Sequence, residues 1–135
     1  MQIVRDYPPN YLKIKDTLHP PANAIYCYGD KIYAPGDGEV TPELIVHEQV
    51  HCDRQGDAIE EWWDEYIYSP QFRLAEELPA HRAEYQAYLT RVPALSRPQR
   101  RRILKILAKR LSGPLYGKLI SFERAKAALK GDASG

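Results

Sequence analysis

The spacing of hydrophobic positions changes along the chain from strand-like runs to helical repeats. Two short runs rich in Ile and Tyr, residues 24–28 and 31–34, flank the two-residue link Gly29-Asp30, and this pattern predicts a β-hairpin. Before it, residues 7–11 contain two prolines and predict an extended lead-in. Helical spacing is clearest near the end of the chain, at Ile103, Leu104, Leu107 and Leu111.

Five helices are expected after the hairpin. The first begins at Thr41-Pro42-Glu43, because Thr caps a helix, Pro suits its first position and Glu suits its positive end. It should run to about Gln55 and stop at Gly56. The remaining four are expected over residues 58–68, 69–90, 98–111 and 121–130, with a kink at Pro79. These elements predict a mostly helical α+β domain with one small early sheet.

The length of the chain predicts a single domain, and the distribution of charge divides this domain into two regions. The 135 residues suit one domain with its own core. Residues 1–96 carry 8 basic and 16 acidic side chains, whereas residues 97–135 carry 11 basic and 2 acidic. We therefore expect an acidic body at 1–96 and a basic helical C-terminal extension at 97–135.

The two cysteines and the first residues of the chain bear on the cellular compartment of the protein. Cys27 and Cys52 are too few and too far apart for a zinc ribbon, and we expect two reduced, half-buried thiols. Residues 1–6 lack the features of a signal peptide, and no apolar stretch is long enough to span a membrane. We expect a cytoplasmic protein, located in the host cytoplasm if it is encoded by a phage.

The run H-E-Q-V-H carries the clearest chemistry. His47 and His51 are four residues apart on the first predicted helix, so both imidazoles project from one face and can reach one ion. Glu48 lies beside them and can act as general base toward a zinc-activated water that attacks a carbonyl. The motif therefore predicts a catalytic site with one Zn²⁺ per chain.

A catalytic zinc needs a third protein ligand. The metzincin plan would take it from Asp57, six residues after His51, but Arg54 occupies the position of the required glycine. Met1 is the only methionine, so the chain has no Met-turn. The alternative is a Glu from a later helix. The candidates are Glu60, Glu61, Glu65, Glu76, Glu77 and Glu84, of which the first three follow His51 too closely.

A resemblance narrows this choice. The motif and its surroundings resemble the small gluzincins, or minigluzincins, of bacteria and phages over roughly residues 25–88. The runs that carry the resemblance are I-Y-A-P, T-P-E-L-I-V-H-E-Q-V-H-C-D-R-Q, W-W-D-E-Y and F-R-L-A-E-E-L-P-A-H-R-A-E-Y. The resemblance implies a zincin-like fold in which Glu77 is the third zinc ligand.

Two residues that follow Glu77 on the same predicted helix leave alternatives open. In the pattern N-E-x-x-S-D of larger relatives, His81 takes the Asp position, which supports a ligand histidine from outside the metal's own shell. His81 is also an alternative third ligand or a helix histidine facing solvent. Glu84, two helical turns beyond Glu77, is the second choice for the third ligand. The chain departs from the pattern at Glu76, which replaces Asn, and at Pro79.

Substrate contacts are expected on two further features. By the same resemblance, the strand Lys31, Ile32, Tyr33 and Ala34 is an exposed edge that pairs with an extended peptide through main-chain hydrogen bonds. An oxyanion also needs a donor, which gluzincins take from a Tyr or His after the zinc helices. Spacing does not select among the tyrosines, which are Tyr66, Tyr68, Tyr85, Tyr88 and Tyr116.

The basic helix at 98–111 has three interpretations. The one we favour is a solvated face on a helix that packs against the acidic body. An acidic partner for this helix is the second. Nucleic acid belongs to the same interpretation but is not expected, since no aromatic residues lie between the arginines to stack on bases. The third interpretation, a membrane-surface helix, is not expected either.

Together these features predict a zinc metallopeptidase. We expect an endopeptidase rather than an exopeptidase, with a peptide or protein as substrate. The alternative is a zincin-fold module without catalytic activity, which would keep zinc for stability and belong, for example, to a phage particle. The presence of Glu48 favours catalysis, because a structural zinc site needs no base.

Overall fold

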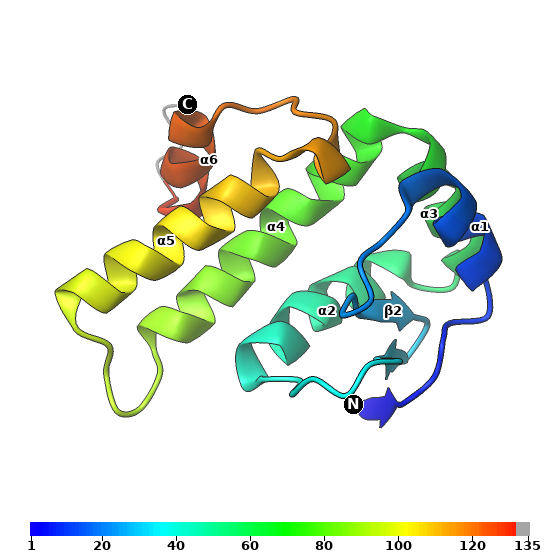
Figure 1. Ribbon diagram of the computed structural model, residues 1–135, viewed down its shortest axis with the longest axis horizontal. Helices are drawn as coiled ribbons and strands as arrows, with labels where there is room; N and C mark the ends of the chain where they lie inside the picture. Colours follow the sequence, from blue (N-terminus) through cyan, green and yellow to red (C-terminus); the bar gives the residue numbers. More distant parts are fainter. Residues whose placement is uncertain (132–135) are drawn as a thin grey trace.

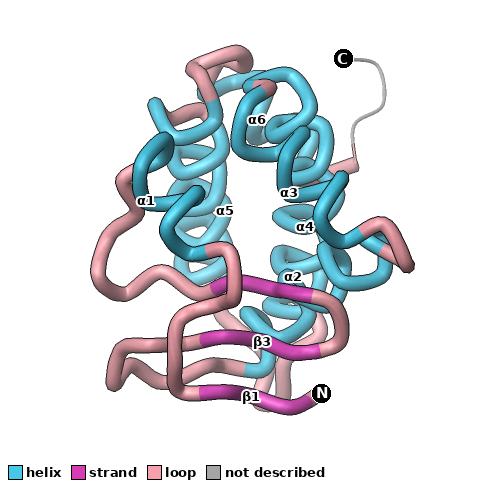
Figure 2. The backbone as a smooth tube through the Cα atoms, turned by 90° about the vertical axis from the view of Figure 1, so that its right-hand side faces the viewer, coloured by secondary structure: helices cyan, strands magenta, loops and turns pink. Residues whose placement is uncertain are grey.

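A three-stranded sheet forms one end of the computed structural model, which describes residues 1–131. Strands β1 (Gln2–Val4), β2 (Tyr26–Tyr28) and β3 (Lys31–Tyr33) lie in the order β1-β3-β2. β2 and β3 form the predicted antiparallel hairpin, with Cys27 opposite Ile32. β1 pairs with β3 in parallel, with Ile3 opposite Ile32. Figure 2 shows the three strands side by side beneath the helices.

The position of β3 corrects one prediction. Lys31, Ile32 and Tyr33 occupy the middle strand and are paired on both sides, and the N–H of Ala34 donates to the carbonyl of Val4 at 2.8 Å. The expected exposed edge at 31–34 is therefore wrong. β1, which the hairpin pattern could not reveal because its pairing spans about thirty residues, covers that edge.

Helix α2 (Pro42–Gln55) begins and ends where the sequence predicted. The Thr41 hydroxyl accepts a hydrogen bond from the N–H of Leu44 at 3.2 Å, and Pro42 occupies the first turn. Gly56 ends the helix with a φ of 53°, a value that favours glycine. The H-E-Q-V-H run is thus held in the middle of a helix with defined ends.

Helix α4 (Pro70–Leu89) is the central element, and it contacts α2, α3 (Ile59–Tyr68), α5 (Arg97–Leu111) and α6 (Phe122–Leu129). Ser69 caps its start, since its hydroxyl accepts from the N–H of Phe72 at 3.2 Å. The helix continues through Pro79 to Leu89. Figure 1 shows α4 running across the molecule with α5 alongside.

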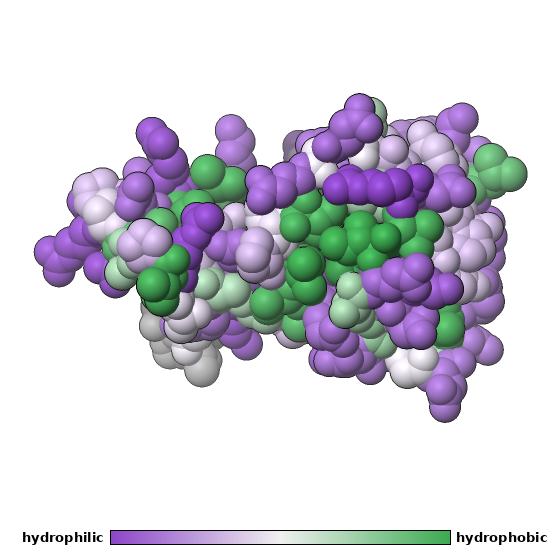
Figure 3. All heavy atoms as spheres, turned by 90° about the horizontal axis from the view of Figure 1, so that it is seen from below, coloured by the Kyte–Doolittle hydropathy of each residue, from purple (hydrophilic) through white to green (hydrophobic). Residues whose placement is uncertain are grey.

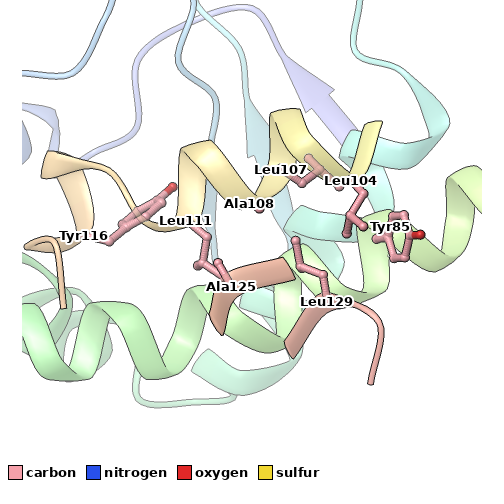
Figure 4. Packing of buried hydrophobic residues seen from close by; sticks show 8 residues of the cluster. All are labelled: Tyr85, Leu104, Leu107, Ala108, Leu111, Tyr116, Ala125 and Leu129. Atoms are coloured by element: carbon pink, nitrogen blue, oxygen red, sulfur yellow. The ribbon is translucent and has the colours of Figure 1, made fainter. Parts of the chain in front are cut away.

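The C-terminal helices share one hydrophobic core with α4. Ser96 and Gln99 form a reciprocal capping box at the start of α5. Leu107, Leu111 and Leu129 are almost fully buried where α5 and α6 meet α4 (Figure 4). A short 3-10 helix, η1 (Pro114–Tyr116), connects α5 toward α6 and brings Tyr116 into this cluster. The mostly helical α+β architecture and these helices confirm the predicted elements.

Two elements at the start of the chain, strand β1 and helix α1, were not predicted. Residues 11–18 form helix α1 (Tyr11–Leu18), although 7–11 predicted only an extended lead-in. Ile14 is its buried residue, and it belongs to a second core cluster with Trp62, Trp63 and Ile67 of α3. Among residues 1–131, no helix is both long enough and apolar enough to cross a membrane.

Cys27 and Cys52 form a disulfide, so the expected pair of reduced thiols is wrong. Their Cα atoms lie 5.8 Å apart, within the range that a disulfide spans. The bond joins β2 to α2 at the residue after His51. The spacing of 25 residues gave no sign of this pairing, because folding brings the two elements together.

Candidate metal centre

Three side chains from α2 and α4 converge at one point. Nε2 of His47 lies 3.1 Å from one carboxylate oxygen of Glu77, and Nε2 of His51 lies 3.0 Å from the other. The possible ligand atoms of the three residues all lie within 4.8 Å of one another, and all three residues are buried. The structure therefore brings together His47, His51 and Glu77 as a group that can hold a metal ion.

The hydrogen bonding of His47 indicates that a cation belongs between these atoms. Its Nδ1 lies 2.8 Å from Glu84 Oε1, which accepts the Nδ1 proton. Nε2 then carries a second proton in the charged ring, or a lone pair that a metal ion can take in the neutral ring. Nε2 then faces Glu77 Oε1, which is buried and makes no hydrogen bond within residues 1–131. Tetrahedral zinc sets neighbouring ligand atoms about 3.3 Å apart, and the two imidazole–carboxylate distances, 3.1 Å and 3.0 Å, are close to this value. The residues fit a zinc ion.

Glu84 lies behind His47 and does not occupy the position of a third metal ligand. Its carboxylate is fully buried on the Nδ1 side of His47, away from Glu77, so it is not a third ligand beside the two histidines. Arg110 of α5 donates to the same oxygen at 3.0 Å. A carboxylate in this position fixes the tautomer and orientation of a ligand histidine. Glu84, and not His81, is thus the residue placed to support the imidazole of His47.

His81 lies beside Glu77 rather than behind a ligand histidine. It is fully buried, which excludes the solvent-facing alternative. Its Nδ1 is 2.8 Å from the main-chain carbonyl of Glu77 and 3.3 Å from the Glu77 carboxylate. Its ring packs against His47 with centroids 4.8 Å apart. His81 is outside the metal-capable group and can position the Glu77 carboxylate.

The charged groups around His47 and His51 favour a cation at the centre. Burial lowers the pKa of His47, but the carboxylates of Glu77 and Glu84 outweigh burial and raise this pKa to about 10. Burial raises the pKa of Glu77, yet His51, His47 and His81 together hold it well below the usual value. The carboxylates therefore favour a positive charge on or between the imidazoles, which a proton or a metal ion supplies.

Glu48 lies beside this group without belonging to it. Its side chain is buried, and its Oε2 makes no hydrogen bond within the described residues. Burial raises the pKa of Glu48 above the usual value, while the neighbouring His51 and His47 oppose that rise. A carboxylate with a raised pKa and a free oxygen can accept a proton at the metal centre.

A cavity of about 490 Å³ opens onto the centre. Much of its wall is apolar, and it includes Ile14, Leu18, Ile25, Leu44 and Leu115. Figure 3 shows a wide hydrophobic area on the face of the molecule seen from below. Apolar walls with a few convergent polar groups are typical of ligand sites.

The structure also narrows the choice among the tyrosines. Tyr66 and Tyr116 are buried and line the cavity, whereas Tyr68 is exposed. Tyr85 lies in the core around α5, and the partly buried Tyr88 packs against that core. The Tyr66 hydroxyl donates to Glu77. No hydrogen bond within residues 1–131 occupies the hydroxyl of Tyr116, whose ring lies 5.7 Å from that of His81. Of the five tyrosines considered for the oxyanion, Tyr116 is therefore the one that lines the cavity with a free hydroxyl donor.

The departure from pattern at Glu76 has a structural role. Glu76 is buried and accepts hydrogen bonds from Arg54 of α2, at 2.7 Å, and from the Trp62 indole of α3. It thus fixes three helices around the residue next to Glu77. Arg54 and Trp62 carried no recognisable signal for this role in the sequence.

Two chain segments around the hairpin border the cavity, one before β3 and one after it, which includes Ala34 and Gly36. Asn23, Ala24, Ile25 and Tyr26 line the cavity. Beyond them, the carbonyl of Cys27 accepts hydrogen bonds from Gln55, at 2.8 Å, and from Trp63, at 3.1 Å. The outer edge of β2 is therefore occupied at Cys27, whereas residues 23–26 before it lie beside the cavity.

Comparisons of the chain with protein-family models, with curated proteins and with solved structures found no match. The interpretation of the centre therefore depends on its own residues and their geometry.

Proposed function

We propose that the protein is a zinc-dependent metallopeptidase of the small gluzincin type. The observation that carries the proposal is the convergence of His47, His51 and Glu77 with Glu48 buried beside them. Three protein ligands leave one position open, as catalytic zinc sites do, whereas structural sites fill all four with protein ligands.

Each residue then has a distinct task. Zinc, when bound by these three ligands, supplies a Lewis acid that lowers the pKa of water toward neutrality. Glu48 accepts the proton of the attacking water and passes it to the leaving amine. Glu84 and Arg110 hold the imidazole of His47 in the ligand tautomer. The Tyr116 hydroxyl is the donor available to the developing oxyanion.

The cavity supports a peptide as substrate. Its apolar walls suit a large hydrophobic side chain next to the cleaved bond. The backbone of residues 23–26 borders the cavity and can take the place of the strand at 31–34 in pairing with an extended peptide. The proposal is of an endopeptidase, because an extended peptide contacts such a site on both sides of the cleaved bond.

One comparison of variants tests this function. Glu48→Gln should keep one zinc per chain and lose cleavage of a peptide library, whereas Glu77→Ala should lose both. Glu123→Gln, an exposed substitution on α6, is the matched control and should change neither. Metal content is measured by mass spectrometry of the purified protein, and cleavage by peptide mapping.

The outcomes separate the proposal from its alternative. A Glu48→Gln variant that cleaves as fast as the parent would disprove the mechanism. A parent that holds one zinc but cuts no peptide would instead indicate a zincin-fold module that keeps the metal for stability. A parent that binds no zinc at micromolar concentration would exclude both.

A further inference from the structure

The outward face of α5 carries a ladder of cations. Arg101, Lys105 and Lys109 follow one another at four-residue steps, and all three are exposed. Like charges at this spacing destabilise a helix. α5 contains no acidic residue, and no ion pair within residues 1–131 neutralises these three side chains. Arg110, the paired cation of α5, turns instead toward Glu84.

A matching ladder of anions lies on α3. Glu60 and Asp64 form one four-residue step, and Glu61 and Glu65 form another, with all four side chains exposed. α3 contains no basic residue. Asp64 pairs with Lys13, and Glu60 accepts a hydrogen bond from Tyr28. Glu61 and Glu65 have no ion pair within the described residues.

The two ladders cannot pair within one molecule. α4 lies against both helices, and Figure 1 shows α5 toward one end of the molecule and α3 toward the other. Seen from below, hydrophilic side chains project from the end that holds α5 (Figure 3). A four-residue step rises about 6 Å on any α-helix. The charges of α5 are therefore opposite in sign to those of α3, and both sets follow the same four-residue spacing.

From this complementarity we infer that the cationic face of α5 docks on the anionic face of α3 of a second copy of the chain. Such a contact is head-to-tail, because each molecule offers a different surface to each neighbour. It produces a ring if the rotation closes and a chain of molecules if it does not. Neither surface includes a residue of the metal centre, so the contact is independent of the proposed activity.

Sedimentation velocity of the full chain tests the contact. Charges on exposed faces are screened over about 10 Å at 0.1 M salt and about 30 Å at 0.01 M. The protein should therefore associate at about 0.02 M salt and dissociate at about 0.3 M. The triple variant Arg101→Glu, Lys105→Glu, Lys109→Glu should weaken this association by more than about tenfold. The double variant Glu61→Lys, Glu65→Lys should do the same.

A mixture of the two charge-reversal variants is the decisive test of the contact. In the first variant, positions 101, 105 and 109 of α5 are acidic like positions 61 and 65 of α3, and in the second variant both sets of positions are basic. Neither variant should therefore self-associate, but an equal mixture should. Arg124→Glu, an exposed charge reversal on α6, should leave the parent behaviour unchanged. Circular dichroism checks that every variant keeps its helices.

Three results would overturn the inference. The parent could stay monomeric at low salt at every concentration. The parent could associate while the reversal variants associate equally well, which would locate the contact elsewhere. The mixture could fail to restore association. If the monomeric parent bound a DNA duplex and the α5 variant did not, the occupant of this face would be nucleic acid instead.

Discussion

Glu84 Oε1 lies 2.8 Å from Nδ1 of His47, on the side of the imidazole that faces away from Glu77. Glu84→Gln keeps the size of the side chain but removes the charge that holds this tautomer. Loss of such a partner weakens metal binding by about 10- to 100-fold. We expect this loss in a competition titration with a chromophoric zinc chelator.

The control for that experiment is Glu77→Gln, which changes a ligand rather than its support. It should weaken zinc binding more than Glu84→Gln does. Equal affinity in the parent and in Glu84→Gln would contradict the supporting role of Glu84.

Removal of the metal should lower the thermal stability of the protein. A ligand that binds only the folded state stabilises it by about 4 kcal/mol when its free concentration is a thousand times its Kd. The ligands join α2 to α4, so the effect should appear in unfolding of the whole chain. Differential scanning calorimetry with and without a chelator measures it, and an unchanged melting temperature would argue against a metal at this centre.

Zinc binding should release a proton at neutral pH. His47 has a pKa raised to about 10 in the metal-free protein, so its imidazole is protonated at pH 7, whereas a ligand imidazole is neutral. The apparent affinity for zinc should therefore rise with pH until about pH 10. In the metal-free protein, the stability contributed by this proton is fully present below about pH 6.5 and lost as the pH rises through about 10.

Calorimetry in two buffers with different heats of ionisation measures the released proton. A binding heat that is the same in both buffers at pH 7 would show that His47 is neutral before zinc arrives.

The Cys27–Cys52 disulfide should stabilise the fold. The cysteines are 25 residues apart, and in the chain-entropy account closing such a loop contributes about 3.5 kcal/mol. Replacing both residues by Ser should lower the free energy of unfolding by about that amount in a urea titration. Thiol titration of the unfolded, unreduced parent should find no free thiol, and two free thiols would disprove the bond.

Local signals in the sequence were sufficient to predict most helices. Thr41 and Pro42 define the start of α2, Gly56 defines its end, and Ser69-Pro70 separates α3 from α4. In each case the determining contacts lie within a few residues, as they do for the Thr41 cap. The pairing of His47 with His51 also depends only on helix spacing, and so it was predictable from the motif.

Contacts between distant residues were not predictable in the same way. The parallel pairing of β1 with β3, the disulfide and the position of Glu84 depend on how whole elements pack. Glu77 and Glu84 are both glutamates on one helix, and sequence spacing alone could not decide which of them faces the histidines. The choice follows from the side of the His47 ring that each carboxylate meets.

The parallel strand β1 has a practical consequence for handling the protein. Deleting residues 1–5 would leave Ile32 and Tyr33 on an open edge of the sheet and would remove the hydrogen bonds that Arg5 donates to the carbonyls of Gly36 and Gly38. Open edges recruit strands from other chains and promote aggregation. Proteolytic trimming of the first five residues would thus convert a protected strand into a nucleus for precipitation.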